Sequence, residues 1–210
     1  MLKTSKLFVY SLCVFSTVAA LAQNGDCKYS KNENDKFTKK KIMQTKSYEL
    51  TPMISIGNTL YASAQSIDGE KSLLIDFNTK KSISIKGKPT DDILSNQVRV
   101  PAGSKLMILL GDENTVTLDA KEDFSGKTTY TSSTQQGVTA FSKPTTTYEL
   151  NTTTTVKYLL SDESIQLLTK QSSNSLRMYY IDAENKEQYF DCDFGKKKTN
   201  TLSNMIGCVK

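Results

Sequence analysis

Residues 148–160, YELNTTTTVKYLL, carry the pattern that decides the fold. One parity repeats through the stretch without a break, at Tyr148, Leu150, Thr152, Thr154, Val156, Tyr158 and Leu160. Because side chains two residues apart lie on the same face of a β-strand, the pattern predicts one long strand, or two strands joined by a bend, with a single buried face. The threonines agree with this interpretation, since β-branched residues are favoured in strands.

Shorter runs with the same two-residue period precede this stretch. Their apolar faces are Leu60, Ala62 and Ala64; Leu73, Ile75 and Phe77; and Ile83 and Ile85. Turn-forming residues separate the runs at Asp68-Gly69, at 78–80 and at 111–114. Residues 105–110 are apolar on both faces of the expected strand, which predicts a central position in a sheet. The weakly patterned residues 122–143 predict either a long loop or a marginal hairpin.

Two segments change to a helical period. Ser161 is followed by two acidic residues, which predicts a capped short helix over residues 161–169. A stripe of apolar residues predicts a terminal helix over residues 199–208 and consists of Leu202, Met205, Ile206 and Val209. We therefore expect a mainly β domain over residues 47–210, an antiparallel β-sandwich-like fold with these two helices. A polar, exposed lead-in precedes it at residues 23–46, with Phe37 and Ile42 as its apolar anchors.

The first 22 residues have the three parts of a secretory signal peptide. Lys3 and Lys6 give a positive start, residues 7–21 are mostly apolar and uncharged, and Ala20-Leu21-Ala22 forms a small-x-small cleavage site. The apolar run is shorter than the roughly 20 residues needed to span a bilayer. We expect residues 1–22 to be removed, the mature protein to be periplasmic or secreted, and no membrane span to remain after cleavage.

Three cysteines remain after that cleavage: Cys27, Cys192 and Cys208. An exported chain meets an oxidising compartment, so one pair is expected to form a disulfide. The favoured pair is Cys192–Cys208, which would tie a strand to the terminal helix that follows it. Cys27–Cys208 is the rival pair, because the two ends of a domain often lie close together.

The composition excludes several kinds of chemistry. The chain contains no histidine, which removes Ser-His-Asp triads, Cys-His pairs and the usual histidine-bearing metal sites. No glycine-rich phosphate loop is present, and the three cysteines are too widely spaced for a metal site. We expect no cofactor and no metal. The net charge of the chain is +5. Its lysines form short runs at residues 39–41, 80–81 and 196–198, and these runs lack the interleaved aromatic residues on which a single-stranded nucleic acid would stack. Exposed surface explains these runs better, so we expect no nucleic-acid partner.

Carboxylates are the remaining catalytic option. The closest groups are Asp91 with Asp92, expected in a turn, and Asp191 with Asp193, expected on one strand face. Two such acids can hydrolyse a glycosidic bond when they are held about 5 to 10 Å apart. No other catalytic group converges on either pair, so we interpret both as exposed surface acids. Residues 182–185 could bind calcium but lack the glycine and final glutamate of an EF-hand loop, and a plain turn explains them.

Tyr179, Tyr180 and Tyr189 are the candidate binding residues, because an exposed tyrosine-rich patch is typical of an interaction surface. Packing in the core is the alternative for each of them. The first functional hypothesis is an exported, non-enzymatic binding module whose partner is an envelope protein or a glycan. The alternative is an acid-based hydrolase, such as a carbohydrate-active enzyme. A purely structural envelope component is the third. An enzyme would bring two carboxylates into one cleft and shift the pKa of one of them.

Two segments resemble a known group of proteins. Residues 27–38 contain the run Asp35-Lys36-Phe37-Thr38, and residues 158–179 read as a strand, a short helix and a second strand that carries Arg177. Both are similar to segments of small uncharacterised exported proteins of the Bacteroidetes group, in which an Asp-x-Phe-Thr motif follows the signal peptide. The resemblance implies a Gram-negative periplasmic or secreted setting and a β-rich fold, and it implies no activity.

Overall fold

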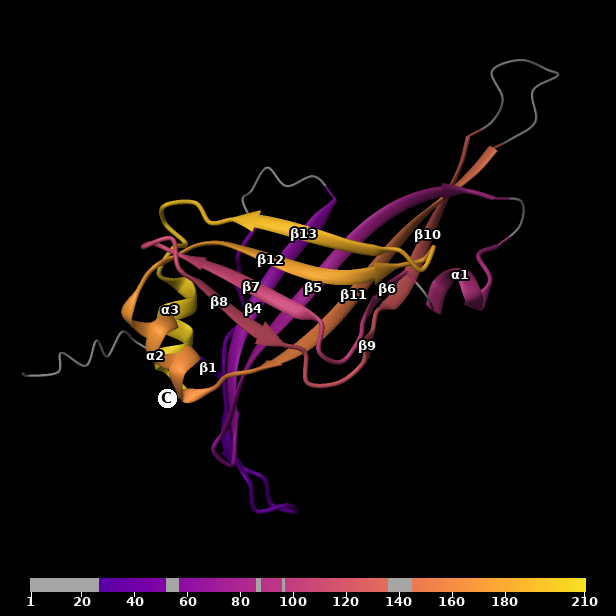
Figure 1. Cartoon of the computed structure of the whole chain (residues 1–210). Helices are drawn as coiled ribbons and strands as arrows, with labels where there is room; N and C mark the ends of the chain where they lie inside the picture. The colour runs from indigo at the N-terminus through magenta and orange to yellow at the C-terminus, as the bar shows by residue number, and fades with distance from the viewer. Residues whose placement is uncertain (1–26, 52–56, 86–87, 96, 136–144) are drawn as a thin grey trace, which may run out of the picture.

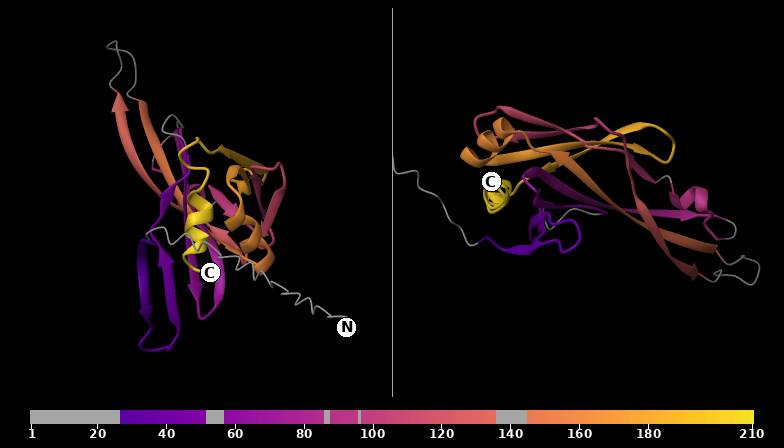
Figure 2. Two further views of the ribbon diagram at one scale, coloured as in Figure 1. Left: turned by 90° about the vertical axis from the view of Figure 1, so that its left-hand side faces the viewer. Right: turned by 90° about the horizontal axis from the view of Figure 1, so that it is seen from below.

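Antiparallel strands form two stacked sheets in this protein (Figures 1 and 2). The structure is a computed structural model that describes residues 27–51, 57–85, 88–95, 97–135 and 145–210. The larger sheet has seven strands: β1 (Tyr29–Asn34), β2 (Lys41–Thr45), β3 (Tyr48–Glu49), β4 (Asn58–Ile67), β5 (Glu70–Ser84), β10 (Lys127–Gln135) and β11 (Thr145–Leu159). The smaller sheet has six: β6 (Val98–Val100), β7 (Lys105–Leu110), β8 (Thr115–Asp119), β9 (Phe124–Ser125), β12 (Ser173–Asp182) and β13 (Glu187–Asp193). The described helices are α1 (Asp91–Ser95), α2 (Asp162–Lys170) and α3 (Thr201–Gly207). The mainly β, sandwich-like fold expected from the sequence is confirmed.

The stretch YELNTTTTVKYLL forms one strand without a bend, β11. It pairs antiparallel with β5 from Thr147–Ser84 to Leu159–Ser72, and its single-parity face is buried in the core at Val156 and Tyr158. The turn expected at residues 78–80 is wrong, because β5 continues through them. β11 pairs with β5 along this whole region. The Thr153 hydroxyl also donates a hydrogen bond to Asn78 Oδ1 at 2.7 Å, so the polar side chain of Asn78 has a hydrogen-bond partner within the sheet.

The core lies between the two sheets. From the larger sheet come Leu60, Ala62, Leu73, Ile75, Phe77, Val156 and Tyr158, and from the smaller sheet come Leu106, Ile108, Leu110, Val116, Leu118, Leu176 and Met178. Phe77 contacts the aromatic rings of the opposite sheet, with centroids 5.3 Å from Tyr180 and 5.2 Å from Phe190. Burying such side chains contributes roughly 1.5–3 kcal/mol each, which makes this interface between the sheets the main source of stability.

The strand expected over residues 105–110 is β7, and it is central, between β8 and β12. Only one of its faces is buried, however. Leu106, Ile108 and Leu110 point into the core, whereas Met107 is half-buried and Leu109 is 36% exposed on the other side. The predicted central position is confirmed, but no other described element packs over the outer face of this sheet, so its apolar side chains lie at the surface.

Both expected helices are present, at one end of the sandwich (Figures 1 and 2). α2 is capped by Ser161, whose hydroxyl accepts from the Ser164 N–H at 3.1 Å, and it buries Ile165 and Leu168. α3 packs against α2 and β4 and buries Leu202, Met205 and Ile206. None of the helices in the described ranges has the length and apolar character needed to cross a membrane.

The disulfide joins Cys27 to Cys208, with their Cα atoms 5.7 Å apart, so the favoured pairing of Cys192 with Cys208 is wrong and its rival is the observed one. Cys192 is a free, buried thiol on the core face of β13, and burial raises its pKa to about 12. Cys208 directly follows α3 and lies beside β1. The Tyr29 hydroxyl of β1 donates a hydrogen bond to the Cys208 carbonyl oxygen at 2.9 Å. Strand alternation in β13 points the Cys192 thiol into the core and away from the corner where Cys208 lies.

The polar lead-in expected at residues 23–46 is only partly exposed in its described part: β1 is almost entirely exposed, whereas β2 is half-buried and ends at buried Thr45. Its described part forms the β1–β2 hairpin, which extends the larger sheet by pairing β2 with β4. Phe37 does not anchor this segment, because it is 97% exposed at the turn between the two strands. In the weakly patterned region 122–143, residues 127–135 form β10, which pairs with β11. The expected signal peptide at 1–22 lies outside the described residues.

Candidate functional site

The outer face of the smaller sheet combines tyrosines, a central arginine and apolar side chains. Strand alternation brings one set of side chains to this face, and we call it the tyrosine face: Met107 and Leu109 from β7, Arg177 and Tyr179 from β12, and Tyr189 and Asp191 from β13. In Figure 1 this sheet lies in front of the larger one. Tyr189 is 57% exposed.

Arg177 is the centre of the tyrosine face. The β12–β13 register places it opposite Asp191, and its guanidinium forms two hydrogen bonds to that carboxylate, Nε to Oδ1 at 2.6 Å and a terminal nitrogen to Oδ2 at 2.7 Å. The same guanidinium lies over the Tyr189 ring, 4.3 Å from its centroid. The hydrogen bonds from Arg177 lower the pKa of Asp191, and those to Asp191 raise the pKa of Arg177. The two-pronged contact fixes a long side chain in one rotamer, so the positive charge has a defined position.

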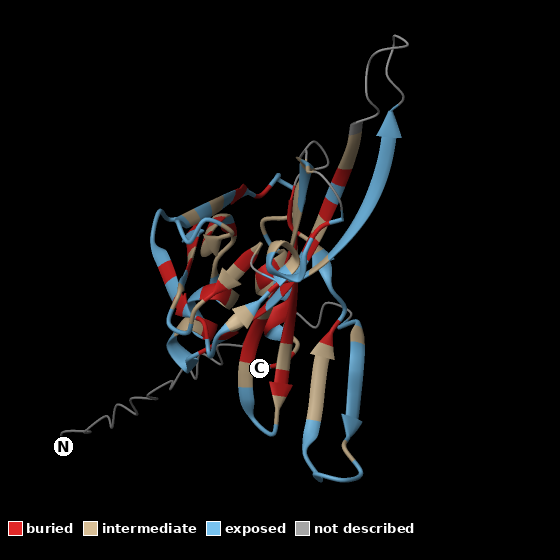
Figure 3. Cartoon of the chain, turned by 90° about the vertical axis from the view of Figure 1, so that its right-hand side faces the viewer, coloured by how far each residue is buried: buried red, intermediate tan, exposed pale blue. Residues whose placement is uncertain are grey.

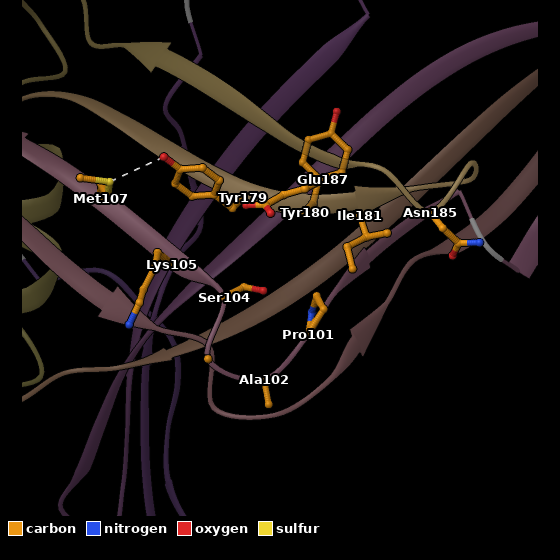
Figure 4. A pocket seen from close by; sticks show the side chains of 11 residues that line it. Pro101, Ala102, Ser104, Lys105, Met107, Tyr179, Tyr180, Ile181, Asn185 and Glu187 are labelled. Carbon is orange, nitrogen blue, oxygen red and sulfur yellow. Dashed lines mark hydrogen bonds between the residues drawn. The ribbon is translucent and has the colours of Figure 1, made fainter.

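Tyr179 continues the row toward the loop at residues 101–104. It lies opposite Tyr189, with ring centroids 6.3 Å apart and planes at 55°, and its hydroxyl contacts Met107 Sδ at 3.9 Å (Figure 4). Tyr180, the third candidate tyrosine, has the opposite parity and packs against Phe77 at the core side of the sheet. The structure therefore brings together Tyr179 and Tyr189, while Tyr180 supports the sheet from within.

Two open depressions flank Met107 on this face. The larger, about 610 Å³, lies beside the loop at 101–104 and includes Tyr179, Ile181 and Glu187 in its lining (Figure 4). It exists because β12 pairs with β7 only as far as Met178–Leu106 and with β6 from Ile181–Arg99, while the chain between β6 and β7 loops outward. The smaller, about 260 Å³, is lined by Leu109, Arg177, Asp191 and Asp193 among others. A partner's side chains or sugar rings could fit into these two depressions of the tyrosine face.

The carboxylate candidates are distributed differently. Asp191 and Asp193 share the smaller depression, as their strand parity predicted. Asp91 and Asp92 begin α1, so their expected place in a turn is wrong, and they lie in a helix. The turn at residues 182–185 is confirmed, since the Asp182 carboxylate accepts from the N–H groups of Glu184 and Lys186 at 2.9 and 3.0 Å. Among the residues that the structure describes, no cluster of three or more Cys, Asp or Glu side chains could hold a metal ion.

Met107, Leu109 and Arg177 were not among the binding residues predicted from the sequence. The signal for Arg177 was present. It has the same parity as Tyr179, two residues away. Arg177 and Asp191 each lie seven residues from Glu184, the centre of the hairpin turn. Hairpin register therefore predicts an arginine–aspartate pair across the two strands.

Comparisons with protein-family models, with curated proteins and with solved structures each found no match for this chain.

A second charged cluster lies at the turn between β4 and β5. Glu70 binds two lysines, with Oε1 2.7 Å from Lys121 Nζ and 2.8 Å from Lys157 Nζ. Hydrogen bonds from Lys121 and then Lys157 lower the pKa of Glu70 from 4.5 to about 2. These contacts connect β5, β11 and the segment after β8, so they join the two sheets at their edge.

We expect Glu70→Gln to lower the free energy of unfolding at pH 7 by about 1 kcal/mol, a value limited by solvent screening of an exposed network. A carboxyl whose pKa is lower in the folded chain stabilises the fold above its unfolded pKa near 4.5, and that contribution is lost as the pH falls toward 2. Urea unfolding of wild type and variant should therefore give a difference that narrows steadily below pH 4.5. Glu33→Gln is the control, because Glu33 forms no ion pair with the described residues. A difference that stays constant with pH would show that the ion pairs are not its source.

Proposed function

We propose that this protein is an exported, non-enzymatic binding module that holds an envelope protein or a glycan on its tyrosine face. The observation that carries the proposal is the fixed arginine–tyrosine stack, with Arg177 4.3 Å from the Tyr189 ring centroid, at the centre of a sheet face that no described element covers. Tyrosine and arginine dominate the energetics of binding surfaces, because they combine large contact area with directed hydrogen bonds.

Preorganisation supports the same proposal. Arg177 is already held by Asp191, and Tyr179 and Tyr189 are held against each other. Binding of a partner here would therefore cost little side-chain entropy. At an interface where long side chains are free before binding, ordering each of them costs about 0.5–1.5 kcal/mol. Half-buried Met107 adds apolar area to both depressions, and exposed Leu109 adds it to the smaller one. The face therefore offers aromatic, apolar and charged contacts over one continuous surface.

The alternative, an acid-based hydrolase, has less support. Asp191 and Asp193 do share a depression, but the pKa of Asp191 is lowered by Arg177. A general acid needs a carboxyl whose pKa is raised toward neutrality, so that it carries a proton to give. The ion pair with Arg177 favours the opposite protonation state.

Export is part of the proposal and rests on the signal-like residues 1–22 together with the Cys27–Cys208 disulfide. Disulfides form and persist in oxidising compartments and are rare in a reducing cytosol. The periplasmic or secreted setting implied by the resemblance to exported Bacteroidetes proteins agrees with this.

We expect Tyr189→Ala to weaken capture of the partner about tenfold, the loss typical of a moderate aromatic hot spot. The measurement is affinity capture from the cell's own envelope fraction, followed by quantitative mass spectrometry and by glycan-array binding. Tyr48→Ala is the matched control, because Tyr48 is 37% exposed but belongs to the larger sheet.

The comparison between the two variants decides the outcome. Species that are lost with Tyr189→Ala and kept with Tyr48→Ala identify the partner of the tyrosine face. Equal capture by wild type and Tyr189→Ala would contradict the proposal, and so would turnover of a glycan that is abolished by Asp193→Asn.

A further inference from the structure

The β1–β2 turn, residues 35–40, has a fixed conformation although all of it lies near solvent. Asp35 organises it: its Oδ1 accepts from the N–H groups of Phe37 at 2.8 Å and Thr38 at 3.1 Å, and its carbonyl accepts from Lys39 N–H at 2.8 Å. Asp35 N–H also donates to the Lys40 carbonyl at 2.8 Å, which closes the loop. The hydrogen bonds from the Thr38 and Phe37 N–H groups lower the pKa of Asp35. The loop is therefore a built feature whose side chains have defined directions.

This loop holds an aromatic ring almost entirely in water. Phe37 is 97% exposed, the highest value among the exposed large apolar side chains. The β1–β2 hairpin projects from the body of the protein, and the loop is its tip (Figures 1 and 3). A large apolar side chain held out at a projecting tip loses the free energy that burial would give unless a partner covers it.

The surroundings of Phe37 are basic. Lys36, Lys39 and Lys40 belong to the loop, and Lys41 begins β2. All four are exposed, and none of them forms an ion pair with a carboxylate of the described residues. The one acid of the loop, Asp35, is occupied by backbone N–H groups. The tip therefore presents one ring surrounded by free positive charge.

We propose that the 35–40 loop docks this protein on the surface of an anionic lipid bilayer, with Phe37 inserted at the interface and the lysines over the headgroups. Aromatic rings partition to that interface, and each lysine near an anionic surface adds about 1 kcal/mol of attraction. A projecting tip can bind a bilayer without a preformed pocket, because lipid headgroups move apart around an inserted aromatic ring. A protein partner would need a pocket of its own, and protein hot spots lie at the centre of larger apolar patches, whereas this loop holds no second apolar side chain.

The chain contains no tryptophan, so Phe37→Trp places a single reporter at the tip. With the mature chain, disulfide intact, we expect its fluorescence to shift to the blue on adding vesicles of phosphatidylcholine with phosphatidylglycerol, and not with pure phosphatidylcholine vesicles at the same low salt. Raising the salt should reverse the shift, because screening weakens the lysine term.

Cosedimentation with the anionic vesicles measures the residue contributions. Lys36→Gln with Lys40→Gln should weaken binding about 25-fold, from about 1 kcal/mol per lysine and a tenfold change per 1.4 kcal/mol. Phe37→Ala should weaken it about tenfold. The control is Lys196→Gln with Lys197→Gln, which removes the same charge from an exposed run before α3 and should leave binding within twofold.

Three results would overturn the proposal. One is no emission shift and no cosedimentation at low salt. Another is equal loss of binding in the two double-lysine variants, which would mean general charge attraction without the tip. The third is an emission shift with polyglutamate but not with vesicles, which would make the partner an acidic polypeptide.

Discussion

Cys27→Ser lowers the free energy of unfolding by about 5 kcal/mol, the largest effect we expect from any single substitution. The two cysteines are 181 residues apart in sequence, and loop entropy makes a disulfide that closes so long a loop worth about that much. Cys208→Ser and the double variant should each cost the same as Cys27→Ser, because all three remove one bond. Urea unfolding of the oxidised mature protein measures this.

Cys192→Ala distinguishes the observed pairing from the one expected from the sequence. Cys192 is a small buried apolar residue in this fold, so its truncation should cost only about 1 kcal/mol. Its thiol is protonated at neutral pH, since burial raises its pKa to about 12, and it should resist iodoacetamide in the native state. If Cys192→Ala proved as costly as Cys208→Ser while Cys27→Ser cost nothing, the Cys192–Cys208 pairing would be the right one.

Gly126→Ala should destabilise the fold by about 3 kcal/mol, at the upper end for an overpacked site. Gly126 lies where the chain leaves one sheet for the other, since Ser125 pairs with Arg99 and Lys127 pairs with Thr153. A Cβ built on Gly126 would lie 2.5 Å from Thr152 Cγ2, 2.6 Å from Thr154 Oγ1 and 3.2 Å from the Val98 carbonyl oxygen. The threonines belong to the strand that pairs on both sides, so they have little room to move.

The matched control for that substitution is Gly195→Ala. A Cβ at Gly195 meets nothing within 4 Å, and the residue does not need a left-handed backbone. We expect its midpoint of thermal unfolding to stay within experimental error of wild type, while that of Gly126→Ala falls by several degrees. Equal shifts in the two variants would show that the loss comes from replacing glycine in general and not from the crossing point.

The alternation of polar and apolar residues predicted the strands that have one solvent-exposed face and one buried face. β8 and β11 are of this kind, and so are the two helices with clear apolar stripes. It could not predict the β1–β2 hairpin, because nearly every side chain of β1 is exposed and no face differs from the other. That hairpin is held by backbone hydrogen bonds to β4 and by the disulfide, and neither leaves a two-residue pattern in the sequence.

The candidate site was predictable in part for the same reason. Tyr179 and Tyr189 were predicted as candidate residues, and the hairpin register that pairs Arg177 with Asp191 also places these two tyrosines opposite each other. Tyr180 was a candidate with them, but it has the opposite parity on β12 and packs against Phe77 in the core. Met107 and Leu109 look like core residues in the sequence, and only the absence of a covering element among the described residues makes them part of a surface.

The Cys27–Cys208 bond also decides how this protein responds to mechanical force. Every described strand and helix lies between the two cysteines along the chain, while their Cα atoms are 5.7 Å apart. Tension applied to chain before Cys27 and after Cys208 passes straight from one sulfur to the other and does not load the sheets. A pulling experiment should therefore show almost no extension until the bond is reduced, after which the strands unfold and release their full contour length.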